Sequence, residues 1–442
     1  MKKTLITQKK KVEEKMSLTV FDQKEEVKSR RKSLLAAGVV MPLFCCGVIL
    51  PNSSSAMQTG NTEATLGVTL SAEQDDNITL SSDTAGDVAK EDDMVFHVAP
   101  KLDMTHFFGD HNLNAMLDGD FRKGADLVDG EVNLEAGIGI DFNFDGGLMI
   151  GLSDKYTSEE FDQGLYTESG VSDSQENVYG VKAAYSFGER TSVEADYSHE
   201  WEEYDDEPTT TVYDSDTIKG RITIPVSTLW KSYLKGKVYS IESDEVTTRN
   251  NDKTEGVPGV RWEGPSRFSY WIEGGLGEID YEHEGLEDYS EAVGETGVEI
   301  ALSAWSSLRA SVGSNSYGEL TYDGMFRHNF NDKLALTLSA SRDTLSSYVL
   351  NATDSTYEVS TYRLGLNSTF WERVEAGLTA SYQVQDKTNN SVETLIGKAT
   401  LDYPIQDWIK AGAHYQYATR TADNAGDEYD DNRIGLFVTL SL

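Results

Sequence analysis

Apolar and polar residues alternate with a period of two along most of this chain, and this pattern constrains the fold more than any other feature of the sequence. The last stretch, residues 430–442, reads DDNRIGLFVTLSL. Its apolar residues share one face, except Phe437, which lies among mostly polar residues on the other face. The same alternation recurs over residues 373–385 and 409–417, whereas helical periodicity of comparable length is absent. A period of two predicts β-strands with one apolar and one polar face.

The connections between these stretches are of two kinds. Short connections of turn-forming residues lie near positions 107, 144, 187, 225, 263, 303, 330, 370 and 404. Between most of them lie longer acidic stretches, at residues 156–176, 202–216, 242–256 and 421–431. Antiparallel hairpins with tight turns at one end and long polar loops at the other end would produce this alternation.

This layout predicts an all-β fold, a transmembrane antiparallel up-and-down β-barrel of about 18–20 strands with short periplasmic turns and long acidic extracellular loops. Nine short connections give eighteen strands, and a first strand near residues 64–70 with a last strand at residues 433–442 brings the total to twenty. We expect the last strand to pair with the first, because closure leaves no exposed sheet edge.

Aromatic residues support a membrane-spanning barrel. Membrane interfaces favour amphipathic rings, so we predict a girdle from the tryptophans near the short connections: Trp230, Trp262, Trp271, Trp305, Trp371 and Trp408. Of these, the leading girdle candidates are Trp230, Trp305, Trp371 and Trp408. Tyrosines nearer the long loops are candidates for a second girdle: Tyr197, Tyr239, Tyr317, Tyr382 and Tyr417.

The front of the chain has the layout of an export signal. We predict that residues 1–56 are a signal peptide with an extended n-region and that residues 57–442 are the outer-membrane β-barrel. An apolar run, residues 33–50, follows the basic cluster KSRRK and precedes small residues. An uncleaved membrane anchor is the alternative, although the run is short for a span and contains Pro42. Both cysteines lie in this run, so the exported part has none to form a disulfide.

The charge of the chain limits its partners. A net charge of −37 excludes nucleic acid, because the phosphate backbone would be repelled. The expected partners are outer-membrane lipid and lipopolysaccharide, together with the barrel assembly machinery. No cofactor is expected, although the acidic loops could hold divalent cations loosely at the outer surface. The predicted location is the outer membrane of a Gram-negative bacterium.

The sequence lacks the motifs of an enzyme. Residues 199–205, HEWEEYD, have part of a zinc-binding helix motif, but the second histidine at helical spacing is missing. Neither a G-x-S-x-G elbow nor a glycine-rich phosphate loop is present. We therefore predict that the chain is not an enzyme and has neither catalytic residues nor a dedicated metal site.

The polar faces of the strands would line the barrel interior if the apolar faces contact lipid. The candidate lumen residues on these faces are Lys219, Arg221, Arg363, Arg373, Glu375, Lys398, Asp402, Lys410 and His414. Charge of both signs predicts a hydrated interior, and a barrel of this strand number is wide enough for a water-filled channel. The alternative is that these charges pair into a network that only holds the barrel round.

The closing strand carries the candidate assembly signal, which would be recognised during insertion. Its residues are Leu436, Phe437, Val438, Leu440 and Leu442. Outer-membrane barrels usually end on an aromatic residue, and this chain departs from that pattern because its last residue is Leu442 and its last aromatic residue is Phe437.

Several stretches resemble the β-barrel porin 2 family of outer-membrane barrels. They are LTLSASRDTLSS at 336–347, GLNSTFWERVEAGLTASYQVQD at 365–386, LDYPIQDWIKAGAHYQYATR at 401–420, the closing YDDNRIGLFVTLSL, and LSAEQDDNITLSSD at 70–83, which is similar to an opening strand. In layout the resemblance covers most of the exported chain. It implies a porin-like channel for passage or export of polysaccharide or small hydrophilic solutes, with polysaccharide export components as partners. The alternative is a non-conducting surface barrel with a structural or adhesion role.

Overall fold

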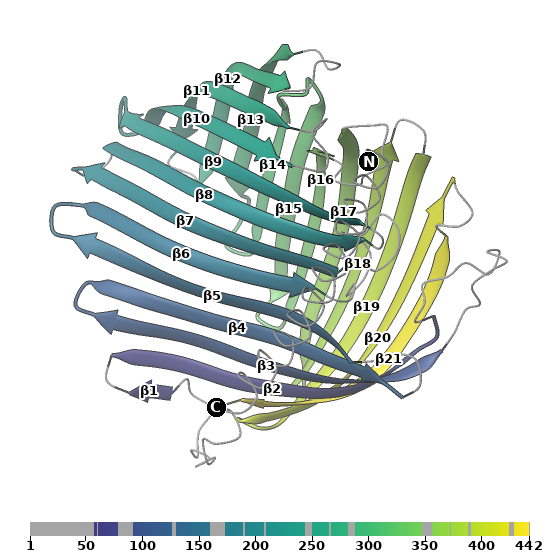
Figure 1. Ribbon diagram of the computed structural model, residues 1–442. Coiled ribbons are helices and arrows are strands. Elements are labelled where there is room, and N and C mark those ends of the chain that lie inside the picture. Colours follow the sequence, from purple (N-terminus) through teal and green to yellow (C-terminus); the bar gives the residue numbers. More distant parts are fainter. Residues whose placement is uncertain are drawn as a thin grey trace, which may run out of the picture. The chain divides into compact units, whose positions relative to one another are not determined.

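The described residues form one closed antiparallel β-barrel (Figure 1). The computed structural model describes residues 57–59, 61–77, 92–125, 130–159, 173–188, 191–206, 209–243, 250–264, 267–281, 288–346, 356–371, 373–387, 390–423 and 428–441. The predicted signal peptide and Leu442 of the predicted assembly signal lie outside the described residues. In the described part of the chain, no helix is long and apolar enough to cross a membrane.

Each strand pairs with its neighbours in the sequence. The strands are β1 Met57–Thr59, β2 Thr62–Asp75, β3 Asp93–Phe108, β4 His111–Gly124, β5 Glu131–Phe144, β6 Leu148–Glu159, β7 Asp173–Phe187, β8 Thr191–Asp206, β9 Thr209–Pro225, β10 Trp230–Glu242, β11 Asn251–Glu263, β12 Phe268–Tyr281, β13 Tyr289–Ala301, β14 Ser306–Ser314, β15 Leu320–Asn331, β16 Leu334–Ser346, β17 Thr356–Phe370, β18 Val374–Lys387, β19 Asn390–Gln406, β20 Ile409–Ala422 and β21 Tyr429–Ser441. The short β1 pairs with β2 alone, so β2 to β21 form the wall of a barrel with twenty strands.

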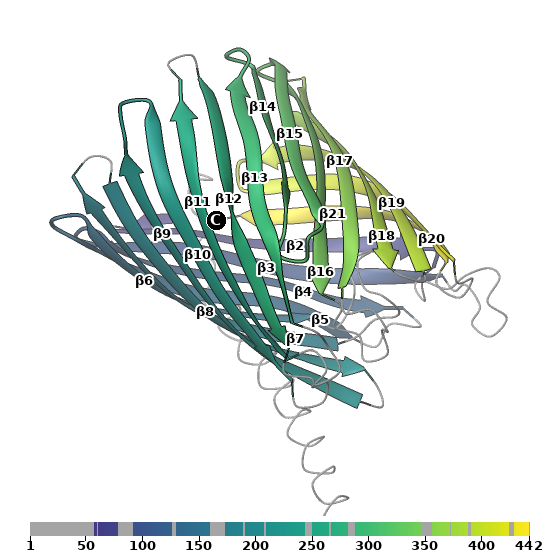
Figure 2. The ribbon, with the colours of Figure 1, turned by 90° about the horizontal axis from the view of Figure 1, so that it is seen from above.

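The barrel closes between its first and last long strands, as predicted. β2 pairs with β21 in antiparallel register, with Leu70 opposite Val438 and Gly67 opposite Ser441. Figure 2 shows the yellow C-terminal strands beside the purple β2. We call this β2–β21 pairing the seam. Its ladder satisfies the backbone groups that two free edges would otherwise expose.

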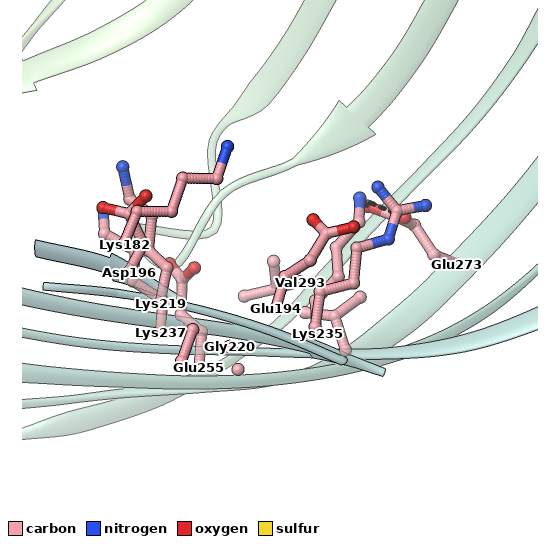
Figure 3. Close-up of a pocket in the computed structure, with 14 residues that line it drawn as sticks. Lys182, Glu194, Asp196, Lys219, Gly220, Lys235, Lys237, Glu255, Glu273 and Val293 are labelled. Atoms are coloured by element: carbon pink, nitrogen blue, oxygen red, sulfur yellow. Dashed lines mark hydrogen bonds and ion pairs between the residues drawn. The ribbon is translucent and has the colours of Figure 1, made fainter. Parts of the chain in front are cut away.

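The two faces of the wall differ in character along every strand. Residues that are opposite each other in the register share a face, and the face changes at each successive residue. Large apolar residues stand exposed on the outer face, among them Phe96 at 52%, Leu234 at 51% and Leu436 at 68%. Charged residues line the other face, which looks into the barrel (Figure 3). The predicted division into apolar and polar faces is therefore confirmed.

The predicted short connections lie at one end of the barrel, and two connections at the other end are also short, between Asp206 and Thr209 and between Lys387 and Asn390. Gly109 and Asp110 join β3 to β4, and Asp332 and Lys333 join β15 to β16. The β5–β6 turn contains Gly146 and Gly147 with φ of 97° and 89°, a backbone conformation that side chains other than glycine rarely adopt.

One predicted loop is largely strand, which corrects the sequence analysis. Residues 202–216 were expected to form a long loop, but β8 continues to Asp206 and β9 begins at Thr209. Glu203 pairs with Val212 within this extension. The threonines and Val212 favour extended backbone, and the ladder satisfies their backbone groups, so the acidic composition does not prevent a strand here.

Candidate functional site: the charged inner wall

The register puts the predicted lumen residues on the inner face of the wall. Glu375 is opposite Asp402, Lys398 is opposite Thr379, and Arg363 is opposite Ser381, all with the inner-face parity of their strands. Lys219, Arg221, Lys410 and His414 share that parity on β9 and β20. Arg373 lies in the turn before β18. Their roles in a channel are a prediction that geometry alone does not test.

One group of these residues forms a paired network. The Nζ atom of Lys410 lies 2.9 Å from Oε2 of Glu375 and 3.5 Å from Oδ2 of Asp402. His414 Nε2 lies 2.5 Å from Oε2 of Glu73 on β2. The imidazole crosses β21 over Gly435, whose missing Cβ would lie 2.5 Å from the ring. This group therefore ties β18, β19 and β20 together and links β20 across the seam.

Other predicted lumen cations are not held in this way. Among the described residues, neither Arg363 nor Lys398 makes an ion pair within 4.0 Å. The charged wall is therefore a mixture of paired groups, as in the network alternative, and groups whose charge faces the interior.

The inner faces of β9, β10 and β11 form what we call the basic wall. Its cations are Lys219, Arg221, Lys231, Lys235, Lys237, Lys253 and Arg261, and its acids are Glu255 and Glu263. Against it lies a cavity of 470 Å³ whose lining includes Lys182, Glu194, Asp196 and Glu273 from neighbouring strands. In Figure 3 the labelled side chains rise from one face of the sheet. Cations are thus concentrated in one sector of a strongly acidic chain.

The inner faces of β2 to β5 form the opposite kind of surface, which we call the acid wall. Its acids are Glu63, Glu73, Asp75, Asp93, Asp103, Asp118, Asp120, Glu131, Glu135 and Asp141, and its basic residues are Lys101, Arg122 and His97. The basic residues are spread among the acids: Lys101 lies 3.2 Å from Asp118, and His97 lies 3.0 Å from Asp120. The acids of this wall therefore share a small number of cationic partners.

At the seam, the acid wall is closed by a buried cluster. The Nε atom of Arg433 on β21 lies 3.2 Å from Oδ2 of Asp75 and 2.6 Å from Oδ2 of Asp431. The side chains of both aspartates are 1% exposed, and that of Arg433 is 11% exposed. A carboxylate buried to this degree needs a cation or a hydrogen-bond donor, and Arg433 supplies both.

Trp271 and Tyr233 are aromatic residues of the inner wall that the sequence analysis did not identify as such. Trp271 was expected in the girdle, but it lies on the inner face and donates from Nε1 to Glu295 at 2.5 Å. Its ring covers Gly297, where a Cβ would lie 2.2 Å from the ring. Tyr233 similarly covers Gly259 and donates its hydroxyl to Glu273 at 2.8 Å. The glycines that face these rings were the available signal.

The girdle candidates lie near the short turns but differ in surroundings. Trp230 is 44% exposed, and Trp371 is 88% exposed. Trp408 is half-buried in the β19–β20 turn. Trp305 borders a second cavity, of 580 Å³, together with inner-face residues such as Glu375, and so lies at the rim of the interior.

The predicted tyrosine girdle divides into two groups. Tyr197 and Tyr382 lie on the outer face and donate their hydroxyls to Asp216 and Glu393 at 2.7 and 2.9 Å. Tyr417 likewise donates to Asp430 at 3.2 Å. Two others differ from the prediction: Tyr239 is on the inner face with Lys237 over its ring, and Tyr317 is in the β14–β15 connection under Lys253. The prediction rested on closeness to the long loops alone, whereas Tyr239 shares the face of Lys235 and Lys237 on β10 and Tyr317 lies outside the strands.

The residues of the predicted assembly signal occupy both faces of β21. Leu436, Val438 and Leu440 are exposed on the outer face. Phe437 points inward, and its ring covers Gly412 and stacks on His414 at a centroid distance of 6.3 Å. Phe437 therefore packs within the barrel wall near the seam.

No metal centre is visible in the part of the chain that the structure describes. Within those residues, no group of three or more His, Cys, Asp or Glu side chains is arranged to hold a metal ion. The acidic loop stretches proposed to hold divalent cations fall partly outside the described residues.

Comparisons with known proteins support the fold. No family model and no curated protein matches this sequence. Among solved structures, the FrpB iron transporter from Neisseria meningitidis matches with a TM-score of 0.52 at 10% identity, over 88% of this chain and 82% of that chain. The copper transporter OprC matches with a TM-score of 0.49 at 11% identity, over 88% of this chain and 81% of that chain. The siderophore receptor PirA from Pseudomonas aeruginosa matches with a TM-score of 0.46 at 9% identity, over 85% of this chain and 80% of that chain.

These findings establish the structural class of the protein but assign it to no family. A closed barrel with an apolar outer face is the architecture by which β-strands cross a bilayer. The chain is a large β-barrel of the Gram-negative outer membrane. The resemblance to the β-barrel porin 2 family has no matching family model behind it and stays a prediction.

Proposed function

We propose that the chain is a channel through which hydrophilic solutes cross the outer membrane. The observation that carries the proposal is the exposure of charged side chains inside the barrel. Lys101, Arg309 and Glu375 come from three different parts of the wall, point inward, and remain 58%, 60% and 56% exposed. A packed interior would bury such groups, whereas a water-filled one solvates them.

The solute is proposed from the chemistry of the wall. Charges of both signs bind water and polar groups, so a hydrated sugar or another small polar solute suits the interior better than an apolar one. The sequence resemblance adds polysaccharide or its fragments as solutes and polysaccharide export components as partners. FrpB, which shares the barrel fold, is itself a transporter, of iron, and transport by this chain is in keeping with that. In this proposal the protein is not an enzyme.

Single-channel conductance in a planar bilayer tests the proposal. The protein purified from outer membranes would be inserted, and neutral and acidic oligosaccharides would be added on either side in turn. We expect discrete open channels whose current falls when a transported sugar enters. A correctly folded barrel that never conducts would refute the channel and favour the surface structural or adhesion role.

A further inference from the structure

Like charges are directly opposite each other on the basic wall. In the β9–β10 register, Lys219 is opposite Lys237, and Arg221 is opposite Lys235. Cross-strand pairs of the same sign repel each other and destabilise the sheet locally. Two such pairs in succession, in a chain with a net charge of −37, need an explanation.

The acids nearby neutralise these cations only in part. Lys235 is held by Glu273, with Nζ 2.6 Å from Oε2. Among the described residues, Lys219, Lys237 and Arg221 make no ion pair within 4.0 Å, although Asp196 and Glu194 are opposite Lys219 and Arg221 across the β8–β9 register. Within the described part of the chain, these three cations thus have no carboxylate within 4.0 Å, although each is opposite one in the register, Lys237 being opposite Glu255.

Arg221 also has an unused donor. Its Nε atom is buried and has no hydrogen-bond partner among the described residues. Its guanidinium lies over the Tyr233 ring, 4.8 Å from the centroid, which fixes the side chain in place. The stacked guanidinium therefore keeps a fixed positive charge on the wall of the cavity.

The three cations share one cavity. Lys219, Arg221 and Lys237 line the 470 Å³ space together with Lys182, which adds a further positive charge from β7. Figure 3 shows Lys219 and Lys237 on the same face of the sheet, with Lys182 beside them. The cavity is large enough for one charged group of a solute and its hydration water. Glu194, Asp196 and Glu255 also line it and would weaken the binding of any anion.

We propose that this cavity is a binding site for an anionic group of the transported solute, a carboxylate or a phosphate. The inference deepens the proposed channel function and rests on it. An anion between Lys219 and Lys237 replaces their repulsion with two attractions. Binding at the wall and release into the wide interior would then let acidic solutes pass stepwise through an acidic chain.

Calorimetric titration of the protein purified from outer membranes tests the site. Inorganic phosphate and D-glucuronate are the two probes, each titrated at constant ionic strength. We expect saturable binding of at least one probe, weakened about tenfold or more in the Lys219→Gln, Lys237→Gln double variant. The probe that binds more tightly distinguishes a phosphate-bearing solute from a carboxylate-bearing one.

Two further variants serve as controls for the titrations. Lys398→Gln removes an inner-wall cation outside the cavity and should leave both titrations unchanged. Lys219→Arg keeps the charge and should retain binding even if the double variant fails to fold. Absence of binding of both probes to the unmodified protein, or equal binding by the folded double variant, would overturn the site.

Conductance separates this inference from the proposed function. Channels that conduct but neither bind nor are blocked by the two anions would leave the channel standing and reject the site. Saturable, lysine-dependent binding to a barrel that never conducts would support the site and reject the channel.

Discussion

The acid wall and the basic wall have similar apolar outer faces, but the prevailing charge on their inner faces is of opposite sign. On the outer face, Phe96 of β3 and Leu234 of β10 are both apolar and about equally exposed, at 52% and 51%. On the inner face, acids prevail on β2 to β5 and cations on β9 to β11. Contact with lipid requires an apolar outer face on every strand, whereas the proposed water-filled interior allows the inner face of each sector to carry a different charge. The information about function therefore lies in the differences between inner sectors.

The walls also differ in how their charges are stabilised. At the seam, the acid wall buries Asp75 and Asp431 around Arg433. On the basic wall, Lys235 is half exposed and is bound by one acid, while Lys219 is exposed. Buried charges are sensitive to the loss of a partner, and exposed charges are screened by water. We therefore expect substitutions in the buried seam cluster to alter stability and substitutions of exposed inner-wall charges, on either wall, to alter ion passage.

The largest effect is expected for Arg433→Leu. This change leaves two buried aspartates without their cation, which should lower the free energy of unfolding by about 3–5 kcal/mol. The measurement is denaturant unfolding of the barrel in detergent, followed by the loss of its heat-resistant mobility on gels.

Arg309→Leu is the matched control for this change. Arg309 is also an inner-wall arginine, but its side chain is 60% exposed and its nearest acid, Asp323, is 3.9 Å away. Its loss should cost about 1 kcal/mol or less. Equal losses for the two variants would mean that burial at the seam does not distinguish the acid wall.

The next effect tests the outer faces, which are expected to behave alike. Phe96→Arg and Leu234→Arg each put a charge on the outer face, at a cost that rises to about 2–4 kcal/mol toward the bilayer midplane. Both variants should reach the outer membrane in reduced yield, measured by quantitative blotting of membrane fractions. Met116→Arg, on the inner face of β4, is the control and should assemble normally. Normal yields of both outer-face variants would contradict the assigned facing.

The sequence predicted the barrel well because alternation and closure are local, repeated signals. The period of two assigned Val438 to the apolar face of the last strand, and the pairing of that strand with β2 in the closed seam follows from the need to avoid free edges. Residues 202–216 show the limit of composition, because acidic residues are as compatible with a strand extending beyond the bilayer as with a loop.

The contacts inside the barrel were less predictable. Charged positions such as Lys410 could be assigned to a face, but which acid each cation meets depends on register and on reach across strands. His414 contacts Glu73, which is 341 positions away in the sequence, by crossing over Gly435. The place of Trp271 likewise depends on Gly297 on the adjacent strand, a packing relation that one strand alone does not reveal.

A smaller effect is expected at the edge of the basic wall, where Trp271 contacts Arg261 and Arg309 through its ring. Trp271→Phe keeps most of the ring but removes the N–H that serves Glu295, so stability should fall by about 1–3 kcal/mol. Trp371→Phe, at a position that is 88% exposed, should change stability by less than about 0.5 kcal/mol. Denaturant unfolding of both variants measures the difference, and a larger loss at Trp371 would reverse the assignment of inner and outer tryptophans.

The smallest effect in free energy is the most informative about function, because it compares the two inner walls directly. Lys219→Gln with Lys237→Gln should make the channel more cation-selective, and Asp103→Asn with Asp118→Asn should make it more anion-selective. Both acids are exposed, at 56% and 48%, so each double change should shift the permeability ratio by about fivefold at most, the equivalent of about 1 kcal/mol for a charge in water. Reversal potentials in a potassium chloride gradient at low ionic strength measure the ratio, since salt would screen the effect. Shifts in the same direction would contradict charge selection by these walls. Opposite shifts would mean that permeating ions sample both walls, so that the basic sector can select what the acidic sector repels.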